Sequence, residues 1–260
     1  MDAREAVTRM LRDLCALVIP LECACGQEGT LLCPSCRTLL QAGAQEVQSV
    51  CDALQIVAAA RVRERSGAPP EPVGVDYRSP FPVLALGEYA GALQRLVVQW
   101  KNGGALVHTG ALAQALAPVV RDIVGSEDPA LYRLVPVPSR PGSRIRRGED
   151  HMALLARALS RRTGVEVLTV RGSLSGSQAG KGARQRRRRT FRAAGAAAAR
   201  DRGRDPARGP APDHPRVILL DDVVTTGSTL RALHEGSPAG AAAVAAVVVA
   251  SARWPAPVRL

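Results

Sequence analysis

The sequence predicts an α/β fold, in which helices flank a mostly parallel sheet and a small cysteine-rich module precedes this body. Short, continuously apolar strand-like runs alternate along the chain with longer helical patterns. Strands that are apolar at every position are buried on both faces, which is typical of a parallel sheet covered by helices. The length of 260 residues, 46% of them hydrophobic, suffices for one such domain with a small attachment.

The individual elements follow from periodicity and from glycine and proline breaks. Strand patterns are expected at residues 83–89, 134–137, 165–170, 217–220 and 243–250. Helical patterns are expected at residues 92–101, 105–124 and 149–162, and a last helix begins near Ser228. Residues 61–82 hold five prolines and little apolar periodicity, which favours a linker between an N-terminal module at 1–60 and a body at 83–253.

Charge is concentrated in one segment of the body. Residues 171–216 carry 13 basic and three acidic side chains, a net charge of +10, out of a formal +12 for the whole chain. The segment also contains two glycine-rich stretches, an alanine run and four prolines, so we expect a mobile basic loop over the sheet edge. Such a loop favours an anionic ligand, either a phosphate compound or DNA.

Neither membrane insertion nor secretion is expected. The longest apolar candidate, residues 239–250, is alanine-rich and shorter than the ~20 residues of a membrane span. Acidic residues stand early in the chain, where a secretion signal has basic residues followed by an apolar core. We therefore expect a cytoplasmic protein, in which cysteines serve as metal ligands or free thiols rather than as disulfides.

The strongest functional signal is the run VILLDDVVTTGSTL at residues 217–230. An apolar strand ends in two carboxylates, Asp221 and Asp222, and a loop rich in Thr, Gly and Ser leads into a helix. In parallel sheets, ligands bind at the carboxyl ends of the strands, and a helix N-terminus attracts phosphate. Carboxylates suit ribose hydroxyls and Mg²⁺. The plainer alternative, an Asp-rich turn with a Ser or Thr helix cap, explains only one Asp and one Thr.

This run resembles the motif with which type I phosphoribosyltransferases bind phosphoribosyl pyrophosphate (PRPP). Further segments narrow the resemblance to the ComF family (competence protein F, also called GntX-like), whose members join a Cys-rich zinc module to a phosphoribosyltransferase domain. The matching segments are CACG with CPSC, YAGALQRLVVQWKNGG at 89–104, LVPVPSRPGSRIRRGEDH at 134–151, SQAGKGARQRRRRTF at 177–191, and the run at 217–230. Their order along the chain is that of the family.

The resemblance implies a role for each matching residue. The 5′-phosphate of PRPP would lie on Thr225, Thr226, Gly227, Ser228 and Thr229. Asp221 and Asp222 would hold the ribose hydroxyls, partly through Mg²⁺, and would act in catalysis together with Arg140 of the pyrophosphate-binding turn. Ser139 of the same turn and Arg147 would complete the contacts with PRPP.

Other parts of the matching segments leave alternatives open. Residues 171–192 would form the flexible lid, although a run of arginines stands where the family has an Asn. Lys101, one of two lysines, is either functional or a surface lysine whose stem lies on apolar groups. His151 is either a base or a structural residue at a helix start, where Glu149 and Asp150 suit the positive end of the helix.

Four of the six cysteines lie close together in the sequence, at Cys23, Cys25, Cys33 and Cys36. Two close pairs suit a tetrahedral structural Zn²⁺, as in a zinc ribbon. The second pair has the usual two-residue spacing, but a single residue separates Cys23 and Cys25, where the ComF family has two. Cys15 or Cys51 could therefore replace a member of the first pair, and reduced thiols without metal are the alternative.

Three functions are compatible with these features. The resemblance to ComF implies Mg²⁺-dependent transfer of phosphoribose from PRPP to an acceptor, with release of pyrophosphate. The second function is that of a non-catalytic competence factor that assists the uptake of single-stranded DNA, with a competence helicase as a partner. The third is that of a PRPP-sensing regulator, which shares the site without turnover. Isolated phosphoribosyltransferase domains often pair, so a homodimer is a further expectation.

Overall fold

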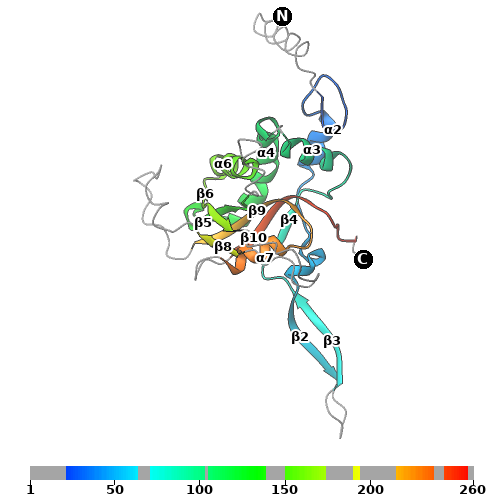
Figure 1. The fold of residues 1–260 in the computed structure, drawn as a ribbon, viewed down its shortest axis with the longest axis vertical. Coiled ribbons are helices and arrows are strands. Elements are labelled where there is room, and N and C mark those ends of the chain that lie inside the picture. The colour runs from blue at the N-terminus through cyan, green and yellow to red at the C-terminus, as the bar shows by residue number, and fades with distance from the viewer. Residues whose placement is uncertain are drawn as a thin grey trace, which may run out of the picture.

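A computed structural model describes residues 22–63, 71–102, 105–138, 150–173, 190–193, 215–236 and 243–256. It shows a six-stranded sheet with helices on both faces, together with two separate two-stranded ribbons (Figure 1). A cluster of four cysteines precedes the sheet in the chain. The α/β class and the mostly parallel sheet predicted from the sequence are therefore confirmed.

The main sheet has the strand order β1-β4-β10-β9-β5-β6. Its strands are β1 (Gln45–Glu46), β4 (Val83–Ala85), β5 (Tyr132–Pro136), β6 (Glu166–Val167), β9 (Arg216–Val224) and β10 (Ala243–Ser251). All neighbouring pairs are parallel except β1 with β4, which is antiparallel. The central strands β9 and β10 are the longest of this sheet, with nine residues each; β10 is apolar except for Ser251, whereas β9 carries Arg216 at its start and two acids after its apolar run.

Helices cover the two faces of the sheet unequally. One face carries α3 (Gly91–Lys101), α4 (Ala105–Val124) and α6 (His151–Thr163), with α2 (Pro34–Gln41) beside them, and the other carries α7 (Ser228–Glu235) (Figure 1). Side chains of successive β9 residues alternate between these faces. Ile218 and Leu220 pack in the core beneath α3, α4 and α6, whereas Val217 and Leu219 pack in the core beneath α7.

The three predicted helices of the body agree with α3, α4 and α6 to within two residues. Local capping explains the bounds of α6. The Asp150 carboxylate accepts hydrogen bonds from the N–H groups of Met152 and Ala153, and Gly164 ends the helix in the left-handed conformation. No helix among the described residues combines the length and the apolar character that a membrane crossing requires.

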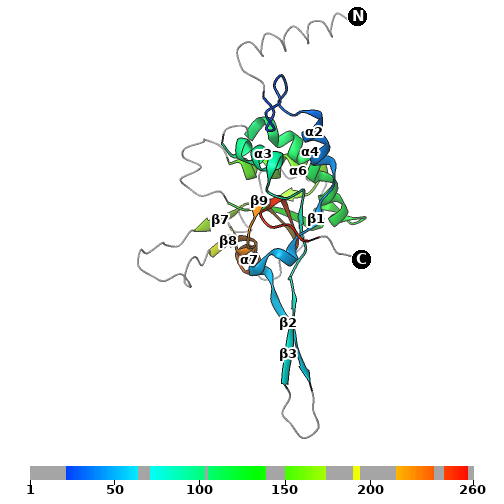
Figure 2. The same cartoon turned by 90° about the vertical axis from the view of Figure 1, so that its right-hand side faces the viewer.

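The segment expected as a linker, residues 61–82, contains strand structure instead. β2 (Ile56–Arg63) and β3 (Glu71–Arg78) form an antiparallel ribbon that projects from the body (Figure 1, Figure 2). The prolines suggested an irregular linker, but both strands of a two-stranded ribbon are edge strands, where proline is tolerated. Pro72 lies within β3 for this reason.

Residues 45–54, expected within the N-terminal module, pack against the main sheet. β1 pairs with β4, and two short 3-10 helices follow it, η1 (Gln48–Val50) and η2 (Asp52–Leu54). Val47, Cys51 and Leu54 are fully buried in the core beneath α7. The segment after the cysteines therefore contributes to the sheet domain rather than to a separate module.

The basic segment at 171–216 is described only in part. β7 (Val170–Ser173) and β8 (Thr190–Ala193) pair in antiparallel fashion, and β8 lies beside α7. Its described parts at 171–173 and 190–193 are therefore strands, where a loop was expected. Residues 174–189 and 194–214, which hold most of the positive charge, lie outside the described residues.

Removal of the β2–β3 ribbon is expected to leave the rest of the fold intact. Ile56 and Arg78 are cross-strand partners at its base, so residues 57–77 can be replaced by a two-residue Asn-Gly turn. Because the extensive contacts of β2 and β3 are with one another, the thermal unfolding midpoint, followed by circular dichroism, should change by less than ~4 °C. A larger drop would contradict this independence.

Candidate functional site

The acidic pair lies in the second half of β9, just beyond the residues that pair with β5. β5 pairs with β9 as far as Pro136 and Leu220, whereas β10 continues alongside, with Val248 opposite Asp221. Because side chains alternate along a strand, Asp222 follows Leu220 to the face of α3 and α6. Asp221 belongs to the opposite face, which carries α7. The two adjacent acids therefore have different neighbourhoods.

The carboxylate of Asp222 meets two basic side chains from different helices. Its Oδ2 lies 2.9 Å from Nζ of Lys101, the last residue of α3, and 3.0 Å from Nε2 of His151, the first residue of α6. Its Oδ1 accepts the N–H of Val223 at 2.6 Å. The side chains of Asp222, Lys101 and His151 are 18%, 27% and 14% exposed, so water screens these contacts only in part.

Burial and the basic groups act on Asp222 in opposite directions. Burial by itself raises the pKa of the carboxyl group, but the hydrogen bond from His151 and the charge of Lys101 outweigh it. The pKa of Asp222 is therefore lowered from its ordinary value. The group is held as a carboxylate, which is the form that accepts hydrogen bonds from hydroxyls or binds a cation.

Trp100 packs against His151 from the interior of the protein. Its ring is fully buried and meets the His151 imidazole edge to face, with centroids 4.7 Å apart and an interplanar angle of 89°. Its indole N–H donates to Oγ1 of Thr109 at 3.0 Å. The ring is therefore held in one orientation by contacts on two sides.

The sequence left the roles of Lys101 and His151 open, and the structure brings both to Asp222. No spacing rule connects them, because His151 lies 71 residues before Asp222. The signals that point to them are weak ones. Lys101 is one of two lysines in the chain, and both residues lie at helix ends.

The loop after the acids leads into the N-terminus of α7. Thr225 and Ser228 are exposed, and Thr226 and Thr229 are partly buried, so hydroxyl groups surround the first turn. Gly227 occupies the N-cap position and offers no capping side chain, and the first turn holds no acidic residue. The positive end of the helix dipole and the hydroxyl donors of the loop therefore lie at the same place, and together they suit an anion.

Gly227 lies where another side chain would not fit. Its φ is +78°, and a Cβ at this position would lie 2.8 Å from Cγ of Leu54 and 3.2 Å from Cβ of Cys51. The N–H of Ala53 also donates to the carbonyl of Thr226 at 2.8 Å. Residues 51–54 thus pack against the loop and hold it in place. The sequence did not predict this contact, because it assigned these residues to the N-terminal module.

Three residues expected to contact PRPP lie outside the described residues, namely Ser139, Arg140 and Arg147. The described chain reaches Val137 and Pro138. The N–H of Val137 donates to the carbonyl of Leu220 at 2.8 Å. The chain therefore enters the expected pyrophosphate turn directly beside the strand that carries the two acids.

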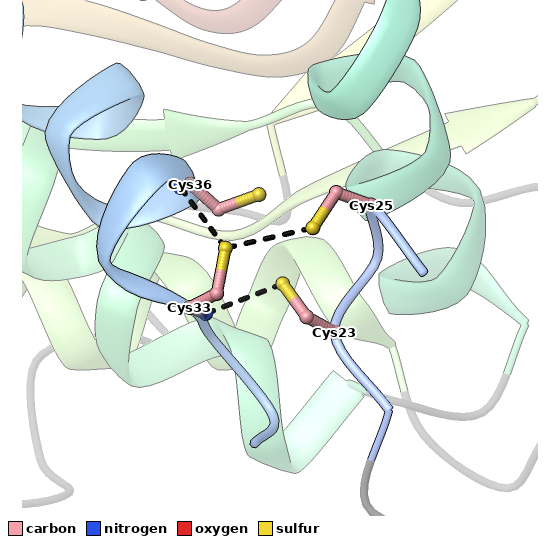
Figure 3. Close-up of side chains that lie close together, drawn as sticks. All are labelled: Cys23, Cys25, Cys33 and Cys36. Carbon is pink, nitrogen blue, oxygen red and sulfur yellow. Dashed lines mark hydrogen bonds between the residues drawn. The ribbon is translucent and has the colours of Figure 1, made fainter. Parts of the chain in front are cut away.

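Cys23, Cys25, Cys33 and Cys36 lie together at the start of α2 (Figure 3). Their Sγ atoms are all within 4.8 Å of one another. Four thiolates bound to a tetrahedral Zn²⁺, each ~2.3 Å from the metal, lie about 3.8 Å apart. The four residues therefore fit a zinc site, and the single-residue spacing of the first pair does not prevent their convergence.

Backbone N–H groups point at the sulfurs of the cluster. The N–H of Cys33 donates to Sγ of Cys23 at 3.3 Å, and the N–H of Cys36 donates to Sγ of Cys33 at 3.4 Å. Burial raises the pKa of the Cys23 thiol, but hydrogen bonds from the backbone at Cys25 and Cys33 outweigh it and lower the pKa to about 7. At Cys23 these donors favour the thiolate, which is the form that binds metal, whereas burial and the neighbouring thiols raise the pKa of Cys36.

Cys51 takes no part in this cluster. It lies in the core beneath α7, where its Sγ donates to the carbonyl of Val47 at 3.4 Å. Burial raises the pKa of this thiol to about 11, so it stays protonated at neutral pH. Of the two cysteines considered as substitutes, Cys51 is thereby excluded, and Cys15 lies outside the described residues.

No family model and no curated protein matches the chain. Similar solved structures include the adenine phosphoribosyltransferase of Leishmania tarentolae, with a TM-score of 0.31 and 15% identity over 54% of this chain and 70% of its own. Those of Leishmania donovani and Trypanosoma brucei have TM-scores of 0.35, at 11% and 10% identity, over 83% of this chain and 79% of their own. The last is a complex with AMP, pyrophosphate and ribose-5-phosphate. Because these TM-scores are low, a functional proposal must depend on this chain's own residues.

Gly227→Ala is expected to destabilise the protein by about 2–4 kcal/mol, because left-handed strain adds to the overlap with Leu54. Urea unfolding measures the loss. Gly125→Ala is the matched control, since Gly125 also has a positive φ of +61° but a Cβ there meets nothing within 4 Å. Only the strain of about 1–2 kcal/mol should appear in this control. Equal losses in the two variants would contradict the close contact at Gly227.

Proposed function

We propose that this chain is a phosphoribosyltransferase of the ComF type, which binds PRPP with Mg²⁺ and transfers ribose 5-phosphate to a nitrogen of an acceptor base. One observation carries the proposal: two carboxylates near the end of a strand are followed by a helix N-terminus whose N-cap residue is Gly227 and which is surrounded by hydroxyls. Carboxylates for ribose hydroxyls and Mg²⁺, next to a cradle for phosphate, match a phosphorylated sugar.

Each part of PRPP has a counterpart in this arrangement. The 5′-phosphate lies against the first turn of α7, where backbone N–H groups and the hydroxyls of Thr225, Thr226 and Ser228 donate hydrogen bonds. The ribose lies at the strand end, where the carboxylates of Asp221 and Asp222 accept from its hydroxyls. Mg²⁺, when bound, supplies positive charge to the pyrophosphate leaving group. Arg140 would add a bidentate contact to the same group.

The reaction breaks the bond between C1 of the ribose and a pyrophosphate oxygen, and forms a bond from C1 to the acceptor nitrogen. Pyrophosphate leaves with the bonding electron pair, and the acceptor nitrogen gives up its proton. Positive charge develops on the sugar during this step, and nearby carboxylates stabilise it. Lys101 and His151 keep Asp222 ionised for that role.

Isothermal titration with PRPP and Mg²⁺ tests the binding site. The double variant Asp221→Asn/Asp222→Asn keeps the size of both side chains and removes both charges, so it should lose ~2–3 kcal/mol, or roughly 30–150-fold in affinity. Asp76→Asn, on the projecting ribbon, is the control and should bind as the wild type does. Absence of binding by the wild type, or unchanged affinity in the double variant, would refute the proposal.

Release of pyrophosphate separates the transferase from a regulator that only senses PRPP. The assay uses purified protein with PRPP, Mg²⁺ and a panel of purine and pyrimidine bases. Release that depends on a base assigns the transferase, whereas binding without release assigns the regulator. The alternative function in DNA uptake is based on the charge of residues 171–216, most of which lie outside the described residues.

We propose further that the four clustered cysteines hold one structural Zn²⁺. The convergence of their sulfurs and the backbone N–H groups aimed at them support this assignment. A cluster of four buried or partly buried thiols with no metal would leave reactive groups in a small core, whereas a bound ion would tie the first cysteine pair to α2.

Protein purified without chelators should contain one zinc per chain by elemental analysis. Cys36→Ser removes a ligand, so it should lose the zinc and unfold at a lower temperature. Cys51→Ser is the matched control, because its thiol lies in a different core, and it should retain the zinc. Zinc-free wild-type protein, or full zinc content in Cys36→Ser, would contradict the assignment.

A further inference from the structure

Helix α3 contacts both the cysteine cluster and the acidic end of β9. Near its start, Ala92 packs against the cluster, and Nε of Arg95 donates to the carbonyl of Ala24 at 2.8 Å. Ala24 lies between the first two cysteines and is 2% exposed. At the other end of the helix, Lys101 forms the ion pair with Asp222. One helix therefore joins two sites that are far apart in the sequence.

The connection through α3 is short and stiff. Lys101 lies about 9 Å further along the helix axis than Arg95, at a rise of ~1.5 Å per residue. One face of the helix is buried through its side chains Leu93, Leu96, Val97 and Trp100. Because such interiors are closely packed, the helix cannot slide or rotate without opening the core. An anchor at Arg95 therefore helps to set the position of Lys101.

α3 also places the second basic group. Trp100 precedes Lys101 and holds the His151 ring edge to face, while its indole N–H is fixed on Thr109. Both groups that contact Oδ2 of Asp222 consequently depend on where the carboxyl end of α3 lies.

A PRPP site needs this control of Asp222. PRPP carries several negative charges, so an uncompensated carboxylate at its binding site would repel it. Two basic groups on one carboxylate oxygen offset the repulsion and hold the carboxylate in a single orientation. Removal of Lys101 therefore exposes the charge of this carboxylate to the ligand, and removal of His151 takes away a contact that orients it.

We propose that Arg95, Lys101 and His151 are positioning residues for the PRPP site, and that α3 thereby links the order of the cysteine cluster to the affinity for PRPP. This inference rests on the proposed function. Lys101 and His151 act directly on the carboxylate of Asp222. Arg95 acts at a distance, because it holds the start of α3 on the backbone of the first cysteine pair.

A double-mutant cycle on the full chain tests the link, with PRPP and Mg²⁺ as the ligand in isothermal titration. Lys101→Met keeps the length of the side chain and removes its charge, and it should lower the affinity about 10-fold or more. Arg95→Ala should lower it about 5-fold. The double variant should lose much less than the product of the two single losses, because Arg95 acts largely through Lys101. Losses that simply multiply would overturn the inference.

Conservative and matched variants separate positioning from general stability. Arg95→Lys retains a donor for the carbonyl of Ala24, and Lys101→Arg retains the cation, so each should recover affinity relative to Arg95→Ala or Lys101→Met. Arg37→Ala is the matched control, since Arg37 is an exposed arginine on α2, close to the same cysteines, and should bind as the wild type does. Equal losses in Arg37→Ala and Arg95→Ala would overturn the inference.

A readout without PRPP tests the structural link alone. Trp100 and Trp254 are the two tryptophans, so Trp254→Phe leaves Trp100 as the only emitter. Trp100 is fully buried, and in this background Arg95→Ala and Cys25→Ser should shift its emission to the red, whereas Arg37→Ala should not. Unchanged emission in Arg95→Ala would overturn the link.

The two proposals can fail separately. If the emission responds but the wild type does not bind PRPP, the proposed function fails. If PRPP binds and neither emission nor affinity responds to Arg95→Ala, this inference alone fails.

Discussion

A carboxylate as buried as that of Asp222 is stable as an ion only beside compensating charge, because burial disfavours the ionised form. Lys101 supplies that charge and His151 adds a hydrogen-bond contact, each from the end of a helix. α3 must therefore end, and α6 must begin, where β9 passes the end of β5. The positions of α3 and α6 on the sheet therefore set the electrostatics of the site. The buried ring of Trp100 on α3 packs against His151 on α6 and so holds the two helix ends together.

The alternation of side chains along β9 places Asp221 and Asp222 on opposite faces of the sheet. Asp222 faces the layer of α3 and α6, where its charge is compensated within the protein. Asp221 belongs to the layer of α7, on the side of the hydroxyl-rich loop. A ligand at this strand end consequently meets groups from both layers of the fold.

The N-terminal part of the chain supports the site in two places. Cys51 and Leu54 pack against Gly227 and leave no space for a side chain there, so the loop follows their surface. Arg95 ties the backbone of the first cysteine pair to α3, which ends at Lys101. Contacts therefore cross the boundary between the cysteine module and the sheet domain that the sequence suggested. The loop thus depends on residues that follow β1, and the ion-pair group depends on the cysteine segment that precedes it.

The sequence by itself determined the features that depend only on residues close together in the chain. Apolar runs defined the central strands, helical periodicity predicted α3, α4 and α6 to within two residues, and the run at 217–230 placed two acids before a helix N-terminus. Tertiary structure alone decided the rest. The ribbon formed because edge strands tolerate the prolines that suggested a linker. Lys101 and His151 reached Asp222, and Leu54 reached Gly227, through packing between segments that no spacing or periodicity connects.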